Sequence, residues 1–258
     1  MKKHLFLIFV FFQLLTVAQS SFQIEPIDSI TFKADLYLGK DVYNNHYFIE
    51  KNALKRVNQN TFFEFQDVAL GKLNAIDFSN PLFLVLFYKD FNTIVLLDHQ
   101  LNETQRISGN DLGLLFEIIG LARQNNLWFY DSIQQKFGLL NLKEVTHKFI
   151  STSFPTKFKN WKATYNNFQW ITPESEVFAI DFFGKIQTLN SIEKADEVLI
   201  LDKNKYLIEQ GKRLFYFDQK TKTEIKIPQK SYQNFCFKDG ILSIFTNDKV
   251  FNYKINLP

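Results

Sequence analysis

The sequence contains a single cysteine and few glycines, and these shortages exclude several classes of protein. Cys236 is the only cysteine, so no internal disulfide can form, and the fold must rest on packing. The nine glycines form neither a Gly-x-Gly-x-x-Gly nor a P-loop pattern, which argues against a nucleotide site built on such a loop. Apolar residues alternate around Cys236, which predicts a buried thiol rather than a reactive one.

Residues with the spacing of a catalytic or metal site are also missing. The four histidines, His4, His46, His99 and His147, are isolated from one another, so no zinc-type spacing occurs. No serine lies in a Gly-x-Ser-x-Gly sequence. The paired acids of glycoside hydrolases cannot be recognised in a sequence, because they come close together only in the folded protein. We therefore predict no catalytic, cofactor-binding or metal-ligating residue and no enzyme. A lyase or hydrolase whose site forms only in three dimensions stays an open alternative.

No apolar run is long enough to cross a membrane, and the longest run lies at the N-terminus. The apolar segment 5–15 follows two lysines and is succeeded by small residues up to Ser20. This is the pattern of a cleaved signal peptide, whereas a membrane-spanning helix needs about 20 apolar residues. We therefore expect residues 1–20 to be a signal peptide. The mature protein is then periplasmic or secreted and does not span the membrane.

The mature chain has almost no net charge. The full sequence carries 30 basic and 27 acidic residues, and loss of Lys2 and Lys3 leaves 28 basic residues against the same 27 acidic ones. This balance gives no electrostatic support for binding to nucleic acid or to an anionic membrane. The predicted partner is therefore another protein and not a nucleic acid.

Aromatic residues are abundant, and they occur in short apolar runs typical of β-strands. The sequence contains 30 Phe, 10 Tyr and 3 Trp, and polar turns rich in Asn, Asp, Gly and Lys separate the runs. Segment 111–124 is the best helix candidate, but Gly113 and Gly120 interrupt it, so we expect a buried strand or strand pair there. The strongest predicted strands are 47–49, 82–88, 93–97, 127–130, 177–180, 198–201, 214–217, 241–245 and 250–253.

A loose repeat joins these strands into hairpins. Several strands end in an aspartate, after which a few polar residues lead into a second strand: Asp98, Asp131, Asp181, Asp218 and Asp248. Such an aspartate can accept a hydrogen bond from the backbone two residues on and so begin a turn. A calcium site would need several carboxylates at one ion, which one aspartate per repeat does not provide.

The predicted fold is all-β, with a single β-propeller of about five to seven four-stranded blades over residues 21–258. A sheet with two apolar faces needs a neighbouring sheet on each face. In a ring of sheets every sheet has two such neighbours, and only short strand edges stay unpaired. A β-sandwich or two small β domains is the alternative. We expect a strand near Ile27–Leu38 to close the ring by pairing with the last strand near Val250–Ile255.

One part of the sequence is more specific than the strand pattern and consists of segments 65–73, 80–82, 85–93 and 96–103, with 127–131 fitting the next blade. These segments resemble a family of exported β-propeller proteins from bacteria that use the type IX secretion system. The resemblance covers about half of the chain well and the rest only by pattern, and it implies no catalytic residues. In compartment the chain is also similar to the periplasmic plug subunit of the type IX outer-membrane translocon. Ser29 and Ser132 lie in Asp-Ser-Ile triplets that resemble the O-glycosylation signal of such bacteria.

Two aromatic segments are the predicted interaction surfaces. The first contributes Phe87, Tyr88, Phe91 and Asn92, and the second, which also carries lysines, contributes Phe158, Trp161, Tyr165 and Trp170. The alternative is that these aromatic side chains fill the space between blades. The predicted function is a non-catalytic periplasmic scaffold that docks on an outer-membrane export or assembly complex. A glycan-binding or small-ligand-binding propeller, or a propeller enzyme, is the alternative.

Overall fold

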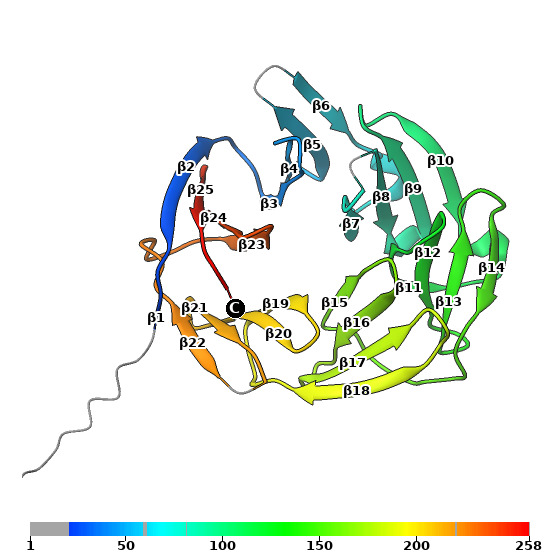
Figure 1. The fold of residues 1–258 in the computed structure, drawn as a ribbon. Coiled ribbons are helices and arrows are strands. Elements are labelled where there is room, and N and C mark those ends of the chain that lie inside the picture. Colours follow the sequence, from blue (N-terminus) through cyan, green and yellow to red (C-terminus); the bar gives the residue numbers. More distant parts are fainter. Residues whose placement is uncertain (1–20, 59–60, 81, 220, 258) are drawn as a thin grey trace, which may run out of the picture.

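The computed structural model describes residues 21–258 except 59–60, 81, 220 and 258, and it consists mainly of strands (Figure 1). The predicted signal peptide, 1–20, lies outside the described residues. Every strong apolar run of the sequence coincides with a strand, and segment 111–124 contains the end of a short 3₁₀ helix and the strand Phe116–Leu121 rather than an α-helix. Within the described part of the chain, no helix has the length and apolar character needed to cross a membrane.

The strands form six four-stranded antiparallel blades arranged in a ring, which confirms the predicted propeller. Blade 1 contains β3 (Leu36–Lys40), β4 (His46–Glu50), β5 (Ala53–Asn58) and β6 (Thr61–Phe65). Blade 2 contains β7 (Ala75–Asp77), β8 (Phe83–Tyr88), β9 (Thr93–Asp98) and β10 (Glu103–Ser108). Blade 3 contains β11 (Phe116–Leu121), β12 (Asn126–Asp131), β13 (Lys136–Asn141) and β14 (Thr146–Phe149).

The last three blades follow the same plan, with N-terminal strands added to two of them. Blade 4 contains β15 (Asn160–Ala163), β16 (Asn167–Ile171), β17 (Glu176–Asp181) and β18 (Ile186–Ser191). Blade 5 contains β19 (Glu197–Asp202), β20 (Lys205–Gln210), β21 (Arg213–Phe217) and β22 (Lys222–Ile225), with β1 (Ser21–Phe22) parallel to β22. Blade 6 contains β23 (Asn234–Lys238), β24 (Ile241–Phe245), β25 (Lys249–Lys254) and β2 (Glu25–Thr31).

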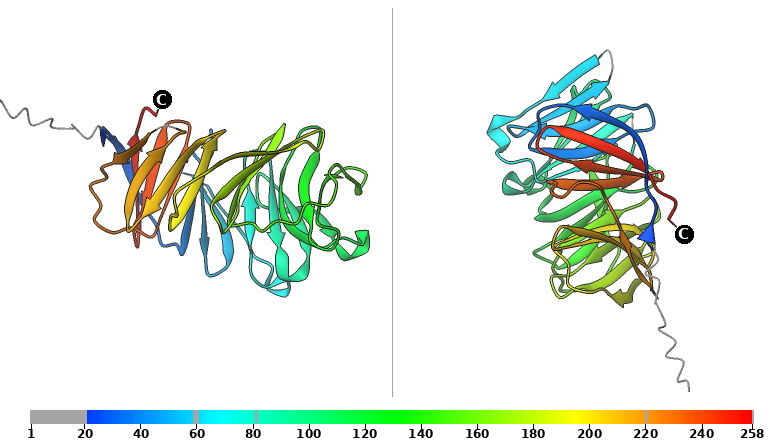
Figure 2. Two further views of the ribbon diagram at one scale, coloured as in Figure 1. Left: turned by 90° about the horizontal axis from the view of Figure 1, so that it is seen from below. Right: turned by 90° about the vertical axis from the view of Figure 1, so that its left-hand side faces the viewer.

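The first strand of each blade lies nearest the centre of the ring (Figure 1). Because the strands alternate in direction, the connections between blades and the loops between second and third strands lie at one end, which we call the crossover face. The remaining loops lie at the opposite face. Figure 2 shows the ring from the side, with the strands running between these two faces. The crossover face carries three short 3₁₀ helices, η1 (Val68–Leu70), η2 (Lys89–Phe91) and η3 (Asn110–Leu112).

The N-terminal strand β2 closes the ring by pairing with β25, as predicted. The two strands are antiparallel from Glu25 opposite Lys254 to Thr31 opposite Lys249. In the same pair, the Asn252 side-chain amide donates to Asp28 Oδ1 at 2.5 Å. Blade 6 therefore combines an N-terminal strand with three C-terminal strands, and β2 covers the edge of β25 that would otherwise be unpaired.

The core consists of side chains packed between neighbouring blades. The gap between blades 3 and 4 contains two fully buried tryptophans, Trp128 and Trp170. The Trp170 ring centroid lies 4.7 Å from that of Phe137 and 5.3 Å from that of Phe178. The aromatic residues thus supply the apolar area that each sheet needs on both faces.

The aspartates of the sequence repeat initiate turns, but they occupy two different positions in the blades. Asp98 and Asp181 follow third strands and accept backbone N–H bonds from the second residue after them, at 2.8 and 2.9 Å. Asp131 instead ends a second strand and accepts from the Gln134 N–H at 2.7 Å. This difference explains the uneven spacing of the repeat. Second strands begin at residues 46, 83, 126, 167, 205 and 241, which are 36 to 43 residues apart.

The single thiol is half-buried on the innermost strand of blade 6 rather than fully buried. Burial raises the pKa of Cys236 to about 12, which keeps the thiol protonated at neutral pH. The prediction of an unreactive cysteine therefore agrees with its surroundings.

Candidate interaction face and central cavity

The structure divides the eight predicted interaction residues between core and surface. Phe87 and Tyr88 are each 1% exposed, Asn92 is 4% exposed and Trp170 is fully buried. These four residues belong to the core, because a side chain without accessible area cannot contact a partner. These four side chains are packed between blades, as the alternative interpretation of the sequence had it.

The other four residues lie in three separate places. Phe91 is half-exposed on η2 of the crossover face, and Tyr165 is equally exposed on the opposite face, in the loop between β15 and β16. Phe158 is half-buried in the connection that precedes β15, and Trp161 lines the cavity at the centre of the ring. The two aromatic segments therefore do not form one surface.

Asn92 joins the loop between β8 and β9 to the connection between blades 2 and 3. Its backbone is left-handed, with φ of 49° and ψ of 41°. Its side-chain amide donates to the Leu114 carbonyl at 2.7 Å and to Asn110 Oδ1 at 2.9 Å. Its Oδ1 accepts from the Phe116 N–H at 2.9 Å. Asn92 is itself buried, and its hydrogen bonds hold these two segments of the crossover face together.

Replacing Asn92 by alanine is expected to lower the free energy of unfolding by about 2–4 kcal/mol, because it leaves buried backbone groups of Leu114 and Phe116 without partners. Urea denaturation of purified protein measures the change. The control is Asn44→Ala, since Asn44 is also left-handed but exposed. Equal losses for the two variants would show that only backbone conformation matters at Asn92.

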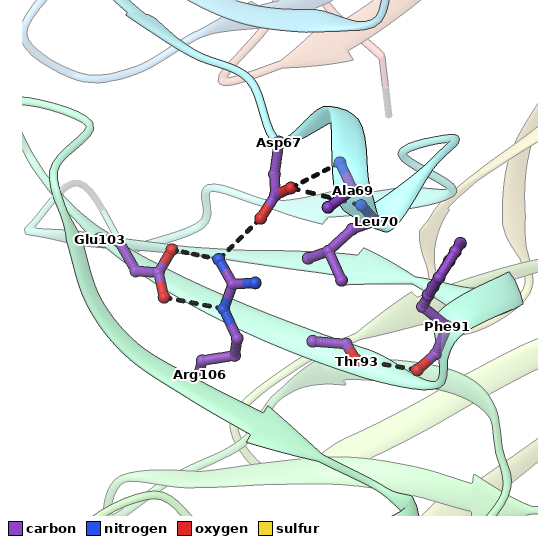
Figure 3. A network of polar contacts seen from close by, with 7 residues as sticks. All are labelled: Asp67, Ala69, Leu70, Phe91, Thr93, Glu103 and Arg106. Atoms are coloured by element: carbon purple, nitrogen blue, oxygen red, sulfur yellow. Dashed lines mark hydrogen bonds and ion pairs between the residues drawn. The ribbon is translucent and has the colours of Figure 1, made fainter.

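Phe91 is an exposed aromatic side chain next to the loop that contains η1. Gly71, at φ of +66°, lies so close to the Phe91 ring that a Cβ there would approach the ring to 3.3 Å. Next to Gly71, η1 exposes Val68, whose side chain is 83% accessible. Figure 3 shows Phe91 on η2 and the buried Leu70 on η1.

An ion-pair network holds η1 in place (Figure 3). Asp67 accepts from the backbone N–H groups of Ala69 and Leu70 at 2.9 and 3.3 Å and caps the helix. Its other oxygen accepts from Arg106 at 2.7 Å, and Arg106 also binds Glu103 through two hydrogen bonds. Although partial burial alone would raise it, the Arg106 guanidinium and the backbone N–H groups lower the pKa of Asp67. The carboxylate therefore stays ionised and keeps η1 fixed.

Two further apolar side chains continue from Val68 and Phe91 toward blade 3. Leu115 is 42% exposed beside the Asn92 amide, and Ile133 is 69% exposed in the next loop. The Ser132 N–H and hydroxyl both donate to the Leu115 carbonyl, at 2.9 and 3.2 Å, so the two loops are joined. We call Val68, Phe91, Leu115 and Ile133 the crossover patch. Only Phe91 was predicted from the sequence as an interaction residue. Val68, Leu115 and Ile133 were not, although each is a large apolar residue in a turn between predicted strands.

The opposite face also exposes apolar side chains, but on separated loops of blades 1, 2 and 4. Tyr43, Leu82, Tyr165 and Phe183 each have more than half of their side chain accessible. Hydrogen bonds also join loops at this face, since the Arg123 N–H donates to the Tyr165 carbonyl at 3.1 Å and the Phe182 N–H donates to the Asn166 carbonyl at 3.2 Å. Loops joined by hydrogen bonds therefore occur at both faces of the ring.

A cavity with a volume of about 640 Å³ lies at the centre of the ring. The first strands of blades 2 to 6 form its wall. Trp161, Phe78 and Phe237 supply apolar area, and Lys159, Lys162 and Lys238 supply charge. Within the described residues, no group of three or more His, Cys, Asp or Glu side chains is placed to hold a metal ion.

The two predicted glycosylation serines differ in accessibility. Ser29 is exposed on β2, the outermost strand of blade 6. Ser132 is half-exposed, and its hydroxyl donates to the Leu115 carbonyl. Glycosylation stays a prediction at both positions, and Ser29 is the more accessible acceptor.

Comparison with known proteins identifies the fold. No family model and no curated protein matches the chain. The solved structure of virginiamycin B lyase from Staphylococcus aureus is similar over 85% of this chain and 80% of that one, with 12% identity and a TM-score of 0.57. YCF48 bound to D1 peptide matches 91% of this chain and 100% of that one, with 10% identity and a TM-score of 0.56. A DUF4221 family member from Bacteroides vulgatus matches 92% of this chain and 99% of its own, with 11% identity and a TM-score of 0.54.

Proposed function

We propose that this protein is a non-catalytic, protein-binding β-propeller of the bacterial cell envelope, which docks on an outer-membrane export or assembly complex through the crossover patch. The observation that carries the proposal is the crossover patch itself. Its four exposed apolar side chains lie on loops that are joined by the hydrogen bonds of Asn92 and Ser132 and by the close approach of Gly71 to the Phe91 ring. The fold alone does not choose a function, since similar propellers include a lyase and a protein bound to a peptide.

The physical chemistry of the crossover patch suits a protein partner. Phe91 and its apolar neighbours would leave water on binding, and each side chain of this size contributes about 1.5–3 kcal/mol when fully buried. Charged groups surround them, including the ion pair between Lys89 and Glu117 at 2.5 Å. An apolar centre with a polar rim is the usual anatomy of a protein interface. Because the loops are already fixed, binding costs little conformational entropy.

The proposed location rests on the N-terminal sequence, whose charged start, apolar run and small residues have the pattern of an export signal. The resemblance to propellers of type IX-secreting bacteria supports an envelope partner. A soluble propeller with a rigid apolar patch is suited to binding the periplasmic side of an outer-membrane complex.

The double variant Phe91→Glu plus Ile133→Glu is expected to reduce recovery of the partner at least about tenfold, because two charges would lie in the desolvated centre of the interface. Affinity purification from gently solubilised envelopes of the native host, followed by mass spectrometry, measures the recovery.

The matched control is Tyr165→Glu plus Phe183→Glu, which adds the same charge to exposed positions of the opposite face. Both double variants should keep the wild-type far-UV circular dichroism and melting temperature. If the wild-type protein is recovered alone, or if the control loses the partner instead, the crossover patch is not the docking site.

A further inference from the structure

The central cavity has the size and the lining of a small-molecule site. Its volume of about 640 Å³ falls within the range of roughly 300–1,000 Å³ that such sites occupy. Most of its wall is apolar, and its largest apolar side chains are Ile76, Phe78, Trp161, Leu199 and Phe237. Cavities of this kind usually bind ligands whose apolar body fills the space and whose polar group is fixed by a few charged residues.

The charged residues of the cavity are mainly lysines. Lys159, Lys162 and Lys238 line it, and Asp77 is the one acidic residue among its described lining residues. Asp77 accepts the backbone N–H groups of Leu121 and Ser79, at 2.8 and 2.9 Å, so its oxygens already have hydrogen-bond partners. No ion pair involves any of the three lysines in the described structure. The cavity therefore carries an excess of positive charge.

The contacts of these lysines do not neutralise them. Lys162 donates to the Leu201 carbonyl at 2.5 Å, and Lys159 donates to the Ala195 carbonyl at 2.6 Å. The Lys238 ammonium lies 5.5 Å from the centre of the Phe78 ring. Burial lowers the pKa of Lys162, and the charge of Asp202 acts in the other direction. Each ammonium keeps donors that a ligand can use, because it has three N–H groups.

A smaller cavity of about 140 Å³ lies beside the first and shares Phe78, Phe237 and Lys238 with it. Its wall adds a fourth lysine, Lys40, from the first strand of blade 1. The positive charge therefore continues around the centre of the ring. Within a low-dielectric wall, such charges attract an anion more strongly than they would at an open surface.

We propose that the central cavity binds a small amphipathic organic anion. Its apolar body lies against Phe78, Trp161 and Phe237, and its carboxylate or sulfonate lies next to Lys162 and Lys238. An inorganic anion would leave the apolar wall unused, and a neutral ligand would leave the half-buried ammonium groups uncompensated. This site is inside the ring and is independent of the crossover patch.

Two fluorescent probes with the same apolar body test the proposal on the mature chain. The first is 8-anilinonaphthalene-1-sulfonate, and the second is N-phenyl-1-naphthylamine, which lacks the sulfonate. The native protein is expected to bind the sulfonate at one site, at least about tenfold more tightly than the neutral probe, since a charge-assisted contact contributes about 1.5–3 kcal/mol. Equal affinities in the wild-type protein would overturn the proposal without any substitution.

The double variant Lys162→Met plus Lys238→Met locates the site. It should weaken binding of the sulfonate probe at least about tenfold and leave the neutral probe within about twofold. The control is Lys143→Met plus Lys230→Met, which removes the same charge from exposed positions outside the cavity. If both double variants weaken the sulfonate probe equally, net charge rather than the cavity explains binding and the proposal fails. Near-ultraviolet circular dichroism checks that each protein is natively folded.

Discussion

A chain that ends at Phe251 is expected not to fold cooperatively. The truncation removes the second half of β25, which is the third strand of blade 6 and the partner of β2. It also removes Tyr253 and Ile255, which are 5% and 2% exposed in the core between blades 5 and 6. Each large buried side chain contributes about 1.5–3 kcal/mol, and the total stability of a domain is only about 5–15 kcal/mol.

The control for this truncation is a chain that begins at Glu25 and lacks the short strand β1 and the two residues that follow it. That strand forms one parallel pairing of two residues with β22, so its loss should lower the melting temperature by only a few degrees. Differential scanning calorimetry compares both chains with the mature protein. A chain ending at Phe251 that melts at the wild-type temperature would show that β25 and β2 do not close the ring.

Replacing Trp170 by alanine is expected to lower the free energy of unfolding by about 3–5 kcal/mol. Its side chain is fully buried, it packs on rings from two blades, and its indole N–H donates to the Thr156 hydroxyl at 3.0 Å. The substitution removes this apolar area and leaves a cavity that the neighbouring rings cannot fill completely. Urea denaturation followed by far-UV circular dichroism measures the loss.

The matched control is Tyr165→Ala, because Tyr165 lies in the same aromatic segment but is 54% exposed. Its cost should stay within about 0.5 kcal/mol, which is usual for a surface position. Trp170→Phe should recover part of the stability that alanine loses. A loss below about 1 kcal/mol for Trp170→Ala would mean that this tryptophan is at the surface, which is one of the two interpretations that the sequence allowed.

The strands and the closure of the ring could be predicted because their signals are local. Apolar runs of four to seven residues bounded by polar turns identify strands directly, and both ends of the chain contain such a strand. The blade period was harder to recognise. An aspartate that starts a turn works equally well after a second strand, as at Asp131, and after a third strand, as at Asp181. The repeated pattern of an apolar strand followed by an aspartate therefore did not correspond to one position in the blade.

The candidate site could be predicted only in part, because exposure depends on distance from the ring axis. Trp161 and Trp170 are directly opposite each other in the pairing of β15 with β16. Trp161, on the innermost strand, reaches the cavity, whereas Trp170, one strand further out, is enclosed between blades. Phe91 could be recognised as an exposed aromatic residue, but its neighbours Val68 and Ile133 come from loops that only the folded ring brings together.

Site-specific photo-crosslinking in the native host tests the proposed docking surface most directly. A benzophenone amino acid is placed in turn at positions 91 and 133 of the crossover patch and at position 165 of the opposite face. If the protein docks through the crossover patch, positions 91 and 133 both form an adduct with one and the same envelope protein, while position 165 forms none with it. Adducts from position 165 alone, or none from positions 91 and 133, would contradict docking through the crossover patch.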